Sequence, residues 1–114
     1  MADRFIASRS AREIFVSAVQ FDEQLRSGRR TVLDVAPVAV AVGARGVEYR
    51  DVYWRDKALE LPAVKRQLAE LRLKASYTTV TPLYHPEPDK QQQLLRDIQD
   101  ARDLGAVLLR VNLG

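Results

Sequence analysis

Four charged residues of this chain could together hold a divalent metal ion and activate a water molecule. They are Glu13, Asp34 and the Glu48-x-Arg50 pair. Carboxylate oxygens are suitable ligands for Mg²⁺, and a basic group beside them can orient an attacking water. Arginine does not readily release a proton, and Glu13 also completes a capping box with Ser10. We therefore expect no resident metal or cofactor.

The predicted order of elements around these residues is a helix, three strands, a helix and a strand. This order is similar to the core order of the PD-(D/E)XK nucleases. The resemblance implies a metal-dependent nuclease in which Glu13, Asp34, Glu48 and Arg50 are the catalytic set. An arginine at position 50 departs from the family's acid-x-lysine pair. A divergent nuclease is therefore an alternative hypothesis.

A second candidate site surrounds His85, which is the only histidine of the chain. Histidine titrates near neutral pH, and His85 follows a predicted strand, where ligand crevices of open α/β sheets lie. Tyr84 precedes it, and Arg55 and Lys57 follow another predicted strand. These four residues form a possible crevice, although no serine or cysteine stands in a nucleophile motif.

The basic residues suggest a third kind of site. Fourteen arginines and four lysines give a net charge of +3, and arginine suits bidentate contacts to phosphate. If they converged on one surface, the following residues would bind nucleic-acid phosphates: Arg26, Arg29, Arg30, Arg45, Lys65 and Arg66. Exposed Tyr49, Tyr53, Trp54 and Tyr77 would then offer stacking platforms.

Composition excludes several other classes. The chain has no cysteine, so disulfides, thiolate metal sites and cysteine nucleophiles are absent. No apolar run approaches the ~20 residues that span a bilayer, and no signal-peptide core is visible. We therefore expect a cytoplasmic protein with no membrane partner.

Hydrophobic spacing predicts the elements that must position these residues. In the first half, apolar residues at helical spacing predict a helix over 11–27, ended by Gly28. Alternating valines predict strands over 31–36 and 38–42, separated by Pro37, and a hairpin partner over 47–54. The turn of this hairpin is Gly43–Gly46, and a change of parity near Arg50 predicts a β-bulge.

In the second half, Pro62 at a first helical position predicts a helix over 62–73. A Tyr/Thr/Val run predicts a strand over 76–81, and Leu94, Leu95 and Ile98 predict a helix over 89–104. Alternation over 106–113 predicts a closing strand. The predicted core is built from Phe15, Phe21, Leu68, Leu71, Leu94 and Ile98.

These elements predict an α/β (α+β) fold in a small single domain over 1–114. The expected mixed sheet combines an antiparallel hairpin with up to three parallel strands, in the order αββαβαβ or αβββαβαβ. The apolar closing strand at a sheet edge favours a homodimer.

The functional hypothesis is a non-catalytic binding or accessory module that meets DNA, RNA or a nucleoprotein partner through its basic residues. Two alternatives stay open: a protein-binding inhibitor or adaptor module, and the divergent nuclease. The sequence favours the binding module because no base–nucleophile pair is visible.

Overall fold

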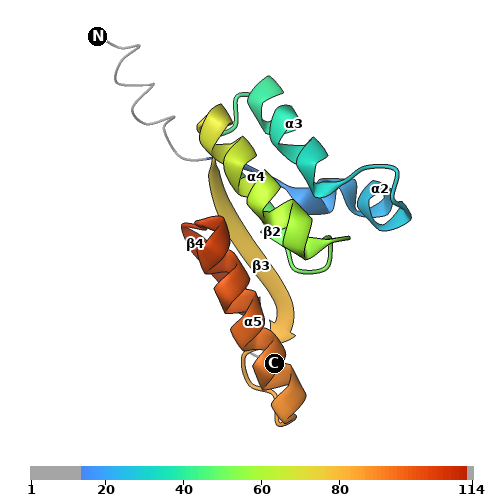
Figure 1. Ribbon diagram of the computed structural model, residues 1–114, viewed down its shortest axis with the longest axis vertical. Coiled ribbons are helices and arrows are strands. Elements are labelled where there is room, and N and C mark those ends of the chain that lie inside the picture. Colours follow the sequence, from blue (N-terminus) through green and yellow to red (C-terminus); the bar gives the residue numbers. More distant parts are fainter. Residues whose placement is uncertain (1–13, 113–114) are drawn as a thin grey trace.

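The computed structural model describes residues 14–112 and shows a small α/β domain built on a four-stranded sheet (Figure 1). All strands are parallel, and their spatial order is the sequence order β1-β2-β3-β4. The strands are β1 (Phe15–Ser17), β2 (Gly46–Arg50), β3 (Lys74–Pro82) and β4 (Leu108–Asn112). The α-helices are α2 (Asp22–Ser27), α3 (Val35–Ala41), α4 (Lys57–Leu71) and α5 (Pro88–Leu104), with 3₁₀ turns η1 (Ala18–Phe21) and η2 (Val32–Asp34).

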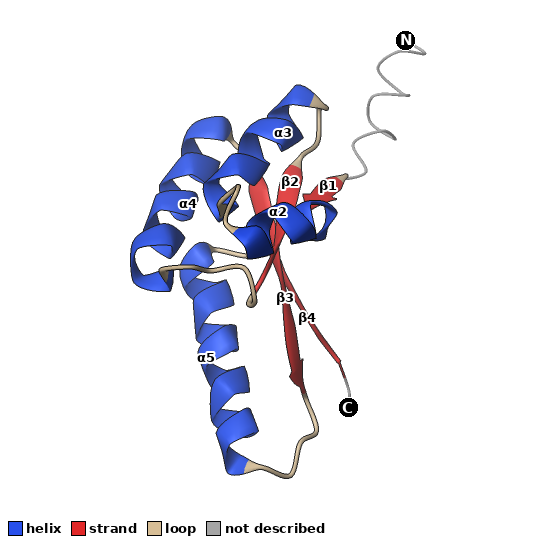
Figure 2. Cartoon of the chain, turned by 90° about the vertical axis from the view of Figure 1, so that its right-hand side faces the viewer, coloured by secondary structure: helices blue, strands red, loops and turns tan. Residues whose placement is uncertain are grey.

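The described helices lie on one side of the sheet (Figure 2). The strand order explains this arrangement. Connections between parallel strands are almost always right-handed, and each connection here steps to the next strand in the same direction. A helix can reach the second face only where the direction of stepping reverses, and this sheet has no reversal.

The strand register divides the side chains between two faces. Val47 and Tyr49 of β2 stand beside Ala75 and Tyr77 of β3, and these four side chains are fully buried in the helix-covered core. Because strand side chains alternate, Glu48 and its neighbours in the register point to the opposite face. We call this opposite side the open face, because none of the described helices covers it.

The first predicted helix, 11–27, is wrong over most of its length. Residues 11–13 lie outside the described residues, as does the capping box from Ser10. The rest forms β1, η1 and the short helix α2, which ends at Gly28 with a left-handed φ of 81°. Ser17 starts the 3₁₀ turn by accepting a hydrogen bond from Val19 N.

The predicted strands 31–36 and 38–42 are also wrong, because this segment is helical. Thr31 and Asp34 form a reciprocal capping box. Pro37 falls in the first turn of α3, where no backbone donor is required. Helical spacing then buries Val35, Ala36 and Ala39.

No hairpin forms around Gly43–Gly46, so the expected antiparallel pair and mixed sheet are wrong. The segment instead leads from α3 into β2, which pairs in parallel with β1 and β3. The predicted bulge near Arg50 is the end of β2, since Asp51 begins a turn. A Cβ atom at Gly46 would lie 2.6 Å from Lys74 O and from the Phe15 ring, so only glycine fits there.

The second half agrees better with the sequence pattern. The predicted strand 76–81 and helix 89–104 correspond to β3 and α5, and Gly105 ends α5 with φ of 80°. Helix α4 begins five residues before Pro62, because Asp56 caps it and accepts from Leu59 N. Of the six predicted core residues, Leu68 and Leu94 are buried, Phe15 and Phe21 are partly buried, and Leu71 and Ile98 are exposed.

Among the described residues, no helix is both long enough and apolar enough to cross a bilayer.

The position of Leu68 on α4 makes a direct test of this core. Leu68 is 4% exposed, whereas Leu59 on the same helix is 71% exposed. We expect Leu68→Ala to lower the free energy of unfolding by about 2–5 kcal/mol because it removes buried methyl groups and leaves a cavity. Leu59→Ala is the matched control and should change it by less than about 0.5 kcal/mol. Urea denaturation measures both, and equal losses would contradict the assigned layers.

Candidate functional site

The open face carries a polar cluster centred on Glu48, in the middle of β2. One carboxylate oxygen accepts from Ser17 Oγ at 2.5 Å, and the other accepts from Thr78 Oγ1 at 2.7 Å. Arg110 Nη1 lies 3.3 Å from the second oxygen. We call Ser17, Glu48, Thr78 and Arg110 the Glu48 cluster. The parallel register assembles it, because each of the four strands contributes one member.

The environment of Glu48 favours the ionised carboxylate. Burial raises its pKa, but the hydrogen bonds from Ser17 and Thr78 and the charges of Arg110 and Arg50 outweigh burial, so the pKa lies below its ordinary value. Because the Glu48 carboxylate is ionised and only 8% exposed, it holds the hydrogen-bond donors around it in fixed positions. It orients the Arg110 guanidinium, which is mostly exposed.

A shallow pocket of about 390 Å³ opens beside this cluster on the open face. Ser17, Glu48 and Arg110 give it a polar side, and Phe15 and Leu108 give it an apolar side. A few polar groups beside apolar walls are typical of sites for small ligands. The Glu48 cluster is therefore the candidate functional site.

Arg50 extends the site toward the carboxyl ends of the strands. It aligns with Thr78 and Arg110 in one row across three strands, so all three share the open face. Among the described residues, the buried Nε atom of Arg50 has no hydrogen-bond partner. The row therefore places an unsatisfied cationic donor on the same face as the partly exposed guanidinium of Arg110.

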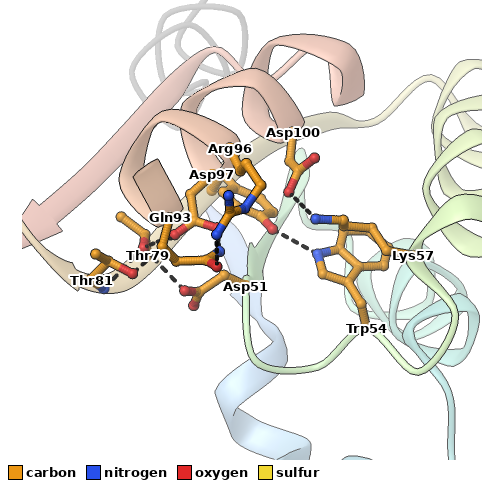
Figure 3. Close-up of polar contacts among 10 residues, drawn as sticks. Asp51, Trp54, Lys57, Thr79, Thr81, Gln93, Arg96, Asp97 and Asp100 are labelled. Atoms are coloured by element: carbon orange, nitrogen blue, oxygen red, sulfur yellow. Dashed lines mark hydrogen bonds and ion pairs between the residues drawn. The ribbon is translucent and has the colours of Figure 1, made fainter. Parts of the chain in front are cut away.

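A second polar network lies on the helix-covered side (Figure 3). Asp97 of α5 is 1% exposed and accepts from Thr79 Oγ1 at 2.6 Å, Thr81 Oγ1 at 3.1 Å and Gln93 Nε2 at 2.9 Å. Asp51 lies 3.1 Å from Thr79 Oγ1. These contacts tie α5 and the loop after β2 to strand β3.

The Thr79 hydroxyl has one hydrogen, and it cannot donate to both carboxylates. Thr79 Oγ1 accepts from Thr81 N, and the shorter carboxylate contact assigns its hydrogen to Asp97, so Asp51 can hydrogen-bond to Thr79 Oγ1 only as a protonated donor. The pKa of Asp51 is raised, first by burial and then by the negative charge of Asp97. This environment favours the protonated form of Asp51, and the buried groups of the network hold α5 and the loop after β2 to strand β3.

The proposed nuclease set does not assemble. Glu13 lies outside the described residues. Asp34 is exposed and caps η2. It belongs to the helix side of the sheet, where Gln67 of α4 donates to the neighbouring Leu33 O. Glu48 and Arg50, in contrast, are on the open face. No group of three potential metal ligands occurs within residues 14–112. The nuclease alternative therefore loses its metal centre within that range.

The four residues of the expected His85 crevice are separated. Lys57 binds Asp100 on α5 at 2.8 Å, and Arg55 lies over Gly28. His85 stands before the start of α5, and its Nδ1 accepts from Glu87 N at 3.1 Å. Twelve residues of helix from Pro88 to Asp100 span about 18 Å, so Lys57 does not reach it. Tyr84 is 73% exposed and joins no described site.

The six basic residues proposed for nucleic acid are also dispersed. Arg26 and Arg29 pair with Asp22 and Glu23, and Arg30 lies over the Phe21 ring, all after the carboxyl end of β1. Arg45 precedes the amino end of β2, at the other end of the sheet. The remaining two, Lys65 and Arg66, are exposed on α4. The described structure does not bring the six together.

The aromatic residues are unavailable for stacking on bases. Tyr49 and Tyr77 are fully buried and Tyr53 is 4% exposed. Trp54 stacks against both Tyr49 and Tyr77, and its Nε1 donates to Tyr77 Oη at 2.6 Å. These rings fill the core, which contradicts the expected platforms.

Sequence reasoning selected Glu48 and Arg50 but missed Ser17, Thr78 and Arg110. These three residues are separated from Glu48 by 31, 30 and 62 positions, and only the parallel register joins them. The available signal was the alternation in the last strand, which sets Arg110 on the opposite face from Leu109 and Val111.

The ionised state of Glu48 predicts how stability depends on pH. Because its folded pKa is lowered, Glu48 contributes stability above its ordinary pKa of 4.5, and the contribution disappears as the pH falls through the folded value. Glu48→Gln should therefore be less stable than the unsubstituted chain at pH 7, with a difference that shrinks below about pH 4.5. Glu70→Gln, on the exposed surface of α4, is the control. A difference that does not change between pH 7 and pH 3 would contradict this assignment.

The helix-side network predicts unequal effects for two similar substitutions. In Asp51→Asn, the new amide can donate to Thr79 Oγ1 while its oxygen accepts from Val80 N, so stability at pH 7 should stay within about 1 kcal/mol or rise. Asp97→Asn faces three donors and should lose about 1–3 kcal/mol.

The raised pKa of Asp51 adds a pH test of the same pair. Its folded carboxyl contributes stability at low pH that is lost as the pH rises through the raised value. The Asp51→Asn variant should therefore gain stability relative to the unsubstituted chain between pH 4 and pH 8, by urea denaturation. If Asp51→Asn were as damaging as Asp97→Asn at pH 7, the assignment of a proton-favouring environment to Asp51 would be wrong.

No protein-family model matches this chain, and no curated protein matches it.

Proposed function

We propose that this chain forms one half of a closed eight-stranded (β/α) barrel, and that the Glu48 cluster lines a binding site for a small polar ligand inside it. The observation that supports this most is the order β1-β2-β3-β4, fully parallel, with the described helices on one side. Consecutive parallel strands with an outer layer of helices are the building units of such barrels.

The two sheet edges allow this closure. Strands β1 and β4 are each paired with one neighbour in the described sheet. A two-fold axis parallel to the strands would set β4 of one copy beside β1 of the other, with both strands running in the same direction. Both edges would then be paired twice, and all eight strands would be parallel.

The exposure of the open face also favours closure. Parallel sheets are normally buried on both faces. Here Val80 is 48% exposed and Leu108 is 56% exposed, and β4 offers its free edge. Four further parallel strands would cover these side chains and remove the edge. We propose that a second copy of this chain supplies these four strands.

The ligand would lie where the strands end. In barrels and open α/β sheets, ligands bind outside the carboxyl ends of the strands. Arg50 and Arg110 occupy the row on the carboxyl side of Glu48, and Arg110 also lines the pocket. We assign to this chain the binding groups of the site. The facing half would complete the site's walls.

Nucleic-acid binding stays a prediction, as does a pure adaptor role. The nucleic-acid hypothesis needs the six basic residues to act on one surface, whereas Arg26 and Arg29 are paired and Arg45 lies at the opposite end of the sheet. The ligand site is preferred because Glu48, Arg50 and Arg110 share one face, and Glu48 and Arg110 line the same pocket.

Self-association tests the closure. We expect sedimentation equilibrium to give twice the 12.9 kDa mass of the chain at micromolar concentration. Leu108→Lys puts a charge on the open face and should shift the chain to monomer. The matched control is Leu59→Lys, which is also exposed but lies on α4, in the helix layer.

Hydrogen exchange distinguishes barrel closure from other dimers. Raising the protein concentration should slow exchange at the amides of β1 and β4 together, because closure pairs each edge with the other. Protection confined to β4, or a monomer at all concentrations, would contradict closure by a second copy.

A further inference from the structure

We infer that the open-face site binds a small oxyanion, such as the phosphate or carboxylate group of a metabolite, between Arg50 and Arg110. This inference rests on the proposed ligand site and names the chemistry of what it binds. It depends on four features of the described residues: register, charge, unsatisfied donors and access.

The register sets the two guanidinium groups at a suitable separation. Arg50, Thr78 and Arg110 are direct neighbours on three adjacent strands. Adjacent strands lie about 4.8 Å apart, so the two arginine Cα atoms are roughly 10 Å apart. Both side chains belong to the open face, and two arginines at this spacing can converge on one group of oxygens.

The charge balance favours an anion. Arg50, Arg110 and Glu48 together carry a net charge of +1, and Asp22, whose pKa the Arg50 charge helps to lower, is paired with Arg26. Glu48 uses its two oxygens to accept from Ser17, Thr78 and Arg110. Both carboxylate oxygens of Glu48 are therefore already occupied by donors within the cluster. Glu48 positions Arg110 and does not neutralise both arginines.

Donors remain unused on both arginines. Within residues 14–112, the buried Arg50 Nε has no hydrogen-bond partner, which costs free energy that an acceptor on a ligand would offset. The contact of Arg110 with Glu48 uses Nη1 at 3.3 Å, and its side chain is 65% exposed. Guanidinium groups match phosphate and carboxylate because both provide paired oxygens.

Access to the site comes from the pocket of about 390 Å³ that Glu48 and Arg110 line together with Ser17, Ser76 and Leu108. This volume suits a small molecule. A ligand there would place its oxyanion against Arg110, at the end of the pocket that faces the Arg50 row, and its remaining atoms against Phe15 and Leu108.

Titration with inorganic phosphate tests this assignment, with acetate as the second probe. We expect phosphate to shift the ¹⁵N–¹H signals of the Arg50 and Arg110 side chains, and Arg50→Gln and Arg110→Gln each to weaken binding about tenfold or more. The control is Arg66→Gln, which removes an exposed arginine from α4 and should bind as the unsubstituted chain does. A response to acetate alone would assign the site to carboxylates, and a response to phosphate alone to phosphates.

The assignment is wrong if neither probe shifts the two arginines, or if Arg66→Gln weakens binding as much as the other two variants. Arg110 is on an edge strand and mostly exposed, so its substitution should leave the fold intact, as circular dichroism can verify. Mass measurements on the same samples separate the two proposals. A dimer that binds no oxyanion would refute only the ligand, and a monomer that binds phosphate would refute only the closure.

Discussion

The handedness of parallel strand connections is the constraint on which the rest of this structure depends. Each connection between strands is expected to be right-handed, and the chain always steps to the next strand on the same side. The helices consequently share one face of the sheet (Figure 2). None of the described helices packs on the other face, which is the open face. The charged and hydroxyl side chains of the Glu48 cluster occur on that face and on all four strands.

This constraint also separates two carboxylates that are three residues apart in sequence. Glu48 points to the open face, where hydroxyl and guanidinium donors lower its pKa in spite of burial. Asp51 follows the end of β2 and contacts Thr79, near Asp97, where burial and a second negative charge raise its pKa. Environments that push the pKa values of neighbouring groups apart indicate different roles. Here the ionised group faces a pocket and the group that favours a proton joins a buried network.

The sequence predicted the elements whose apolar periodicity is unambiguous. Strand β3 and helix α5 were found because a Tyr/Thr/Val run and a leucine stripe admit one interpretation each. Helix α3 was missed because its Val-Ala alternation imitates the two-residue period of a strand. The decisive signals were local: the Thr31–Asp34 capping box and Pro37 in the first helical turn. Wrong strands there produced a hairpin that the parallel sheet excludes.

Prediction of the site failed for a different reason. Glu48 and Arg50 were selected because their spacing resembled a metal-binding pair, but their partners depend on which strand lies beside which. An antiparallel hairpin would have put other residues beside Glu48, whereas the parallel register aligns it with Ser17 and Ser76 and places Thr78 and Arg110 one row further along. The side chains of this site therefore acquire their chemistry from topology. Since Arg110 lies on β4, the last strand of the sheet, the cation of the cluster stands next to a free edge. Whatever pairs with that edge also determines the surroundings of the exposed guanidinium, so assembly and ligand binding at this face are physically linked.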